Sequence, residues 1–67
     1  MLKTGDYVTW ISDPTYVGVL LEIRTGNDVI YPYSVQWLFP QRHFFSYYEH
    51  EIRKITEEDF ILRCLSL

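Results

Sequence analysis

Turn-forming residues divide residues 1–55 into short segments that are rich in β-forming side chains. The breaks lie at Ser12 to Thr15, Gly26 to Asp28 and Phe39 to Arg42, where Asp-Pro, Gly-Asn and proline chemistry favours turns. Between the breaks, Val, Ile, Tyr, Trp, Phe and Thr form runs of about five to ten residues, which are typical of strands. We therefore expect an all-β domain.

Alternation of apolar and polar residues sets the expected strands and their inward faces. Strands are predicted at 6–11, 17–25, 29–39, 43–47 and 52–55, with a single helical turn at 48–51. In the second strand, alternation predicts that Val19, Leu21 and Ile23 face the core. The expected buried core consists of Val8, Trp10, Val19, Leu21, Val35, Trp37, Ile52 and Ile55.

The end of the chain changes from alternation to helical spacing. Thr56 precedes three acidic residues, and such a sequence favours a helix N-terminus. The spacing of the apolar residues that follow predicts a short amphipathic helix over 56–67, whose apolar side consists of Phe60, Ile61, Cys64 and Leu65. A helix this short is not stable alone and must dock on another surface. Whether that surface belongs to the strands of the same chain or to a neighbour stays open.

Composition limits the classes of protein to which the chain can belong. The 67 residues carry a net charge of −3, with 48% hydrophobic and 22% charged residues. The chain is too apolar for a disordered protein, and its pI of 5.1 is far below that of a general nucleic-acid binder, which exceeds about 9. No apolar run approaches the roughly 18 residues of a membrane helix, and no signal peptide is predicted. We expect a cytoplasmic protein that does not bind a membrane.

The residues that could support catalysis or metal binding do not form a known arrangement. His50-Glu51 begins like the zinc-protease helix motif, but Lys54 stands where the second histidine is required. Cys64 is the single cysteine and lies in the apolar side of the predicted helix, which is typical of a structural thiol. We therefore expect no enzymatic activity, no cofactor and no metal site.

The order of the segments resembles that of a small SH3-like barrel. Lys3 to Trp10 resembles the opening Gly-Asp-x-Val strand, Tyr33 to Trp37 the central Val-x-Trp strand, and Tyr47 to Ile55 the closing turn and fifth strand. The layout is similar to KOW and Tudor barrels, and most similar to the short single-barrel proteins of tailed phages. The resemblance implies a five-stranded barrel over 1–55, followed by the helix at 56–67, and a role in holding other molecules.

Aromatic residues are more numerous than a small core requires. The chain has six Tyr, four Phe and two Trp. The rings outside the core either cap the ends of a barrel, or form a surface for a protein partner, or build a cage for a methylated lysine. The candidate partner-binding residues are Tyr7, Tyr16, Tyr31, Phe44, Tyr48, Phe60, Ile61 and Leu65.

The expected function is a non-enzymatic protein–protein interaction or assembly module. The resemblance suggests a bacteriophage accessory or virion component, located in the host cytoplasm or the virion. A homo-oligomer is expected, because the apolar side of the C-terminal helix is suited to a second copy. The alternative function is a small nucleic-acid-binding barrel, since aromatic rings can stack on bases. It ranks lower because the six basic residues form no stripe.

Overall fold

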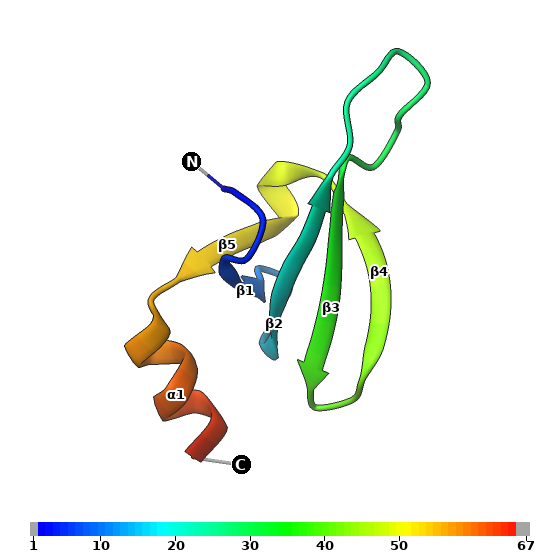
Figure 1. Ribbon diagram of the computed structural model, residues 1–67. Helices are drawn as coiled ribbons and strands as arrows, with labels where there is room; N and C mark the ends of the chain where they lie inside the picture. Colours follow the sequence, from blue (N-terminus) through cyan, green and yellow to red (C-terminus); the bar gives the residue numbers. More distant parts are fainter. Residues whose placement is uncertain (1, 66–67) are drawn as a thin grey trace.

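The computed structural model describes residues 2–65, which contain five antiparallel strands and one C-terminal helix (Figure 1). The elements are β1 (Tyr7–Trp10), β2 (Asp13–Ile23), β3 (Tyr33–Phe39), β4 (His43–Tyr47), the 3₁₀ turn η1 (Glu49–Glu51), β5 (Ile52–Ile55) and α1 (Glu57–Leu65). The predicted β class and C-terminal helix are confirmed. The last two positions of the predicted helix, Ser66 and Leu67, lie outside the described residues.

The strands form one open sheet in the order β4-β3-β2-β1-β5, so β4 and β5 are its two edges. The long strand β2 is shared: its first part pairs with β1, and its second part, from Val17 to Ile23, pairs with β3. In Figure 1, β5, which pairs antiparallel with β1, runs obliquely to β2, β3 and β4. The sheet therefore bends about β2 and encloses a core on its concave side.

The first predicted break is shorter than expected. Asp13 already pairs with Trp10, so the turn between β1 and β2 contains only Ile11 and Ser12. The Thr9 hydroxyl donates to the carbonyl oxygens of Pro14 at 3.1 Å and Tyr16 at 2.8 Å. These bonds hold the proline segment against β1 although proline has no N–H for the strand ladder.

The second predicted break is longer than expected. A tight turn at Gly26 and a third strand from residue 29 were predicted, but residues 24–32 form a loop that projects beyond the sheet (Figure 1). The Arg24 N–H donates to the Pro32 carbonyl at 2.8 Å and closes the base of this loop. Because Pro32 has no N–H, the strand ladder ends there and β3 begins at Tyr33.

The core confirms most of the predicted residues but not the predicted face of β2. Val8, Val35, Trp37, Ile52 and Ile55 are buried as predicted, and the half-buried Trp10 packs against them. The large apolar side chains that are buried in addition are those of Val17, Leu20 and Tyr47, and the polar Thr9 and Ser34 are buried as well.

A β-bulge explains the difference in β2. Leu21 is 49% exposed and Val19 is half-buried, whereas Leu20 is fully buried. Leu20 is paired with Val35 and Ile23 with Tyr33, so β2 advances three residues while β3 advances two. The extra residue, Leu21, reverses the alternation, so that Leu20 and Ile23 both face the core.

Candidate functional site

An open groove of about 490 Å³ lies beside β4. It is lined by Trp10, Tyr31, Phe44, Phe45, Ser46, Tyr47 and Glu51. Phe44 and Phe45 are 53% and 57% exposed, whereas Tyr47 is buried. The groove is therefore mainly aromatic, with one carboxylate, and β4 supplies most of its lining.

The position of β4 at the edge of the sheet explains why both phenylalanines are exposed. Phe44 is paired with Gln36 and Phe45 with Val35, and successive side chains of a strand point to opposite faces. Neither side chain has a strand beyond it to cover it, because β3 is the single neighbour of β4 within residues 2–65. Two adjacent phenylalanines in an edge strand therefore present apolar surface on both faces.

Buried aromatic residues hold the floor of the groove in place. The Trp37 Nε1–H donates to the Tyr47 hydroxyl at 2.9 Å, and this bond is buried. The rings of Trp10 and Tyr47 have their centroids 5.8 Å apart, and those of Phe45 and Tyr47 are 5.3 Å apart. Tyr47 thus connects the groove directly to the core.

The η1 end of the groove is acidic. Glu51 Oε1 accepts a hydrogen bond from the Tyr48 backbone N–H at 2.8 Å, and Glu49 Oε2 accepts one from the Tyr33 hydroxyl at 3.3 Å. Neither carboxylate belongs to an ion pair formed within residues 2–65. Partial burial raises the pKa of Tyr33, and the charge and hydrogen bond of Glu49 raise it further. A binding partner would therefore meet negative charge at this end.

Tyr47 should make folding stability fall at alkaline pH. Burial raises its pKa above the ordinary value of 10.0, with a smaller contribution from the Glu51 charge, while the hydrogen bond from Trp37 acts in the opposite direction. A phenol with a raised pKa in the folded state stabilises the fold fully below the unfolded pKa, and this stabilisation is lost as pH rises through the folded pKa. We expect the free energy of unfolding to decrease from about pH 10 upward.

Urea denaturation at several alkaline pH values, together with tyrosinate absorbance, measures this effect. In Tyr47→Phe, part of the absorbance change that occurs above the ordinary tyrosine pKa should disappear, and the alkaline loss of stability should become smaller. Equal pH dependence in the two proteins would contradict the assignment.

The structure brings three of the eight predicted partner-binding residues together. Tyr31 and Phe44 line the groove, and the Tyr48 ring lies next to Tyr31 with centroids 4.8 Å apart. Tyr16 lies elsewhere, half-buried with its ring 5.6 Å from that of Trp37. Tyr16 therefore contributes to the core and does not lie on the groove.

The C-terminal helix docks on its own sheet. The Phe60 ring stacks on Tyr7 with centroids 4.0 Å apart, and Arg63 Nη1 donates to the Pro14 carbonyl at 2.8 Å. The predicted apolar side of the helix is divided, because Phe60 is half-buried whereas Ile61 and Leu65 are 48% and 78% exposed. Tyr7 and Phe60 are thus used for packing within the chain.

Phe60→Ala should release the helix from the sheet. Loss of the stacked pair and of the apolar area that it buries should cost about 1–2 kcal/mol. A nine-residue helix is not stable alone, so helical circular dichroism should fall while the strands persist. Leu65→Ala is the control on the exposed side of the same helix, and an equal loss of helix in the two variants would contradict the docking.

Five residues of the groove were not among the predicted site residues: Trp10, Phe45, Ser46, Tyr47 and Glu51. The pair Phe44-Phe45 carried a usable signal, since adjacent residues of a strand must point to opposite faces. Trp10 carried no such signal, because it reaches the groove from β1, which is distant in sequence from β4.

Two further features were sought in residues 2–65, a metal-binding cluster and a membrane-spanning helix. This part of the chain contains no group of three or more His, Cys, Asp or Glu residues placed to hold a metal ion. It also contains no helix that is long and apolar enough to cross a membrane. Comparison of the chain with protein-family models, curated proteins and solved structures gave no match.

Proposed function

We propose that the protein is a non-enzymatic module for protein–protein interaction or assembly, and that it binds through the aromatic groove beside β4. The observation that carries this proposal is a groove lined by five aromatic residues, of which Phe44 and Phe45 are more than half exposed although their side chains leave β4 on opposite faces. Single exposed apolar residues are ordinary, but a continuous apolar patch marks an interaction site. Aromatic residues are also enriched at the centres of protein interfaces.

We propose further that the bent sheet is an SH3-like barrel. The supporting features are the meander order of the strands, the long β2 that is shared by the two parts of the sheet, and the 3₁₀ turn before β5. A phage accessory or virion role follows from the resemblance to short single-barrel phage proteins.

Charge favours a protein partner over a nucleic acid. Binding to phosphates depends on free Lys and Arg side chains. Arg24, Lys54 and Arg63 each have a carboxylate within 4.0 Å. Glu51 lines the groove and Glu49 belongs to the same 3₁₀ turn, and both carboxylates would repel a phosphate backbone.

Photocrosslinking from defined positions tests the proposed function. A photoreactive phenylalanine analogue replaces Phe44 or Phe45, and a matched control carries it at Leu21, which is 49% exposed on β2. In cells that express the protein naturally, both groove positions should crosslink to the same protein, and the control should not. Equal crosslinking at all three positions would contradict the groove as the binding surface, and nuclease-sensitive adducts would favour the nucleic-acid alternative.

A further inference from the structure

The free edge of β4 lacks the features that normally prevent edge strands from pairing with other chains. Such edges are usually protected by charged residues, proline or a bulge. β4 has the sequence His-Phe-Phe-Ser-Tyr, and its pairing with β3 is regular from Trp37↔His43 to Tyr33↔Tyr47. The N–H and C=O groups that face away from β3 are therefore available to another strand.

We propose that β4 pairs antiparallel with β4 of a second copy across a two-fold axis at Phe45. The product is a homodimer in which the two sheets become continuous. This inference rests on the proposed function of the groove in protein binding and identifies the partner as the same chain.

The position of the axis follows from the exposed rings. With Phe45 at the centre, all five residues of β4 are paired and Phe45 lies opposite Phe45 of the second copy. Phe44 then lies opposite Ser46 and diagonal to Phe44 of the second copy, within reach of an aromatic ring. The arrangement covers the phenyl rings that the single chain leaves 53% and 57% exposed.

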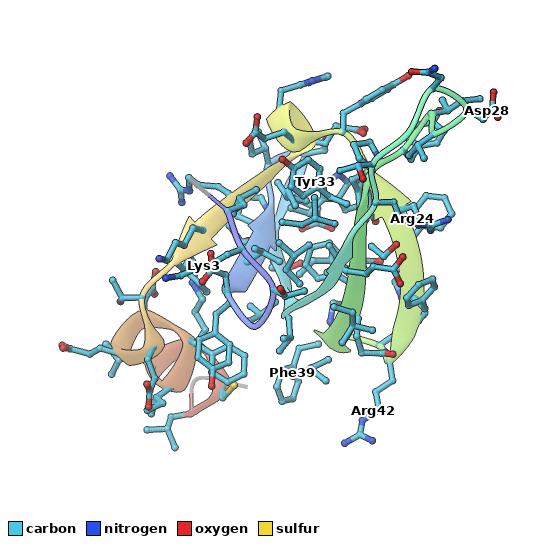
Figure 2. The ribbon with its side chains drawn as sticks, turned by 45° about the horizontal axis from the view of Figure 1, so that its top comes forward. Lys3, Arg24, Asp28, Tyr33, Phe39 and Arg42 are labelled. Atoms are coloured by element: carbon cyan, nitrogen blue, oxygen red, sulfur yellow. The ribbon has the colours of Figure 1, made fainter. Side chains whose placement is uncertain are left out.

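Charges at the two ends of β4 complement each other in the antiparallel arrangement. Arg42 precedes β4 and Glu49 follows it, and neither belongs to an ion pair within residues 2–65. Figure 2 shows Arg42 extending away from the sheet at the turn between β3 and β4. Tyr48 has extended backbone, with φ −77° and ψ 157°, so the strand direction continues to the residue before Glu49.

Antiparallel pairing therefore brings Arg42 opposite Tyr48 of the second copy and one position from its Glu49. The two-fold axis repeats this contact at the other end of the interface. Parallel pairing would instead place Arg42 beside Arg42 and Glu49 beside Glu49, and like charges in such positions are destabilising. The charges thus favour the antiparallel dimer.

This surface differs from the one expected for self-association. The C-terminal helix was expected to meet a second copy, but Phe60 and Arg63 dock it on β1 and on the start of β2 of the same chain. β4 is on the opposite edge of the sheet from β5, which leads into the helix. Removal of the helix should therefore leave a β4 dimer in place if the sheet remains folded.

Charge reversal in purified full-length protein tests the dimer, with sedimentation velocity as the measurement. Arg42→Glu and Glu49→Arg should each weaken dimerisation about tenfold or more, since each creates like-charge contacts at both ends of the interface. The double variant restores opposite charges with their positions exchanged, and should dimerise within about threefold of the unchanged protein. Arg53→Glu and Glu58→Arg are controls that change the net charge equally and should have little effect.

Several outcomes would overturn the inference. The first is that the unchanged protein is a monomer at millimolar concentration. The second is that the control charge reversals weaken dimerisation as much as Arg42→Glu and Glu49→Arg do. The third is that the double variant does not recover dimerisation although its melting temperature is unchanged. A monomer whose Phe44 position still crosslinks to a different protein would overturn the β4 dimer alone. A monomer whose groove positions crosslink no more than Leu21 would overturn both the dimer and the proposed function.

Discussion

Gly18→Ala should remove a large part of the stability of the fold. Gly18 in β2 is paired with Trp37 in β3, and a Cβ atom at Gly18 would lie 2.8 Å from Trp37 Cε3 and 2.9 Å from Trp37 Cα. The Gln36 carbonyl oxygen would be closer still. Two of these three contacts involve backbone atoms, so rotation of a side chain cannot relieve them.

The expected cost is at least about 3 kcal/mol, because the central strands must separate to admit a methyl group. The whole stability of a 67-residue domain is only about 3–10 kcal/mol. Urea denaturation followed by circular dichroism measures the loss. Gly5→Ala is the control: Gly5 has φ +91° with nothing within 4 Å of an added Cβ, so its cost of about 1 kcal/mol comes from backbone strain alone. A native-like midpoint for Gly18→Ala would show that β2 and β3 are not this close.

Trp37→Ala should have a comparable effect for a different reason. Trp37 is fully buried, and its Nε1–H donates to the Tyr47 hydroxyl at 2.9 Å. The substitution leaves a large cavity, which costs about 3–5 kcal/mol for a buried aromatic side chain. It also leaves the Tyr47 hydroxyl without its donor.

Because Tyr47 forms the floor of the groove, the damage should extend to the proposed binding surface. The free energy of unfolding from urea titration measures the effect on stability. Phe44→Ala is the matched control, since Phe44 is an aromatic residue that is 53% exposed, and it should change stability by less than about 1 kcal/mol. Equal costs for the two substitutions would contradict the placement of Trp37 at the centre of the core.

Local sequence signals predicted the elements whose formation depends on neighbouring residues. β4 and β5 have the predicted bounds, and the turn at η1 and the helix after Thr56 lie where expected. Thr56 acts as predicted at the helix N-terminus, since its hydroxyl accepts a hydrogen bond from the Asp59 N–H at 3.0 Å. Turn residues, capping residues and alternation act over a few positions, so they can be seen in one sequence.

The candidate site could be predicted only in part, because local signals do not show which distant residues contact one another. In the sequence, Tyr31, Phe44 and Tyr48 are aromatic residues with no predicted place in the core. In the structure, Tyr31 and Phe44 line the groove and Tyr48 lies beside Tyr31. Tyr7 and Phe60 also stand out, but they stack on each other across 53 positions of the chain. No local pattern states which exposed rings cover one another.

The sequence by itself determined the β class, the C-terminal helix and the burial of Val35 and Trp37 in β3, because these depend on short-range periodicity and turn chemistry. Tertiary structure alone decided which side of β2 is buried, since the bulge at Leu21 arises from its pairing with β3. It also decided that β4 lies at an edge with Phe44 and Phe45 uncovered. Strand order is set by contacts between segments that are far apart in the chain. Such contacts do not produce a local hydrophobic periodicity, so they cannot be recognised from the sequence.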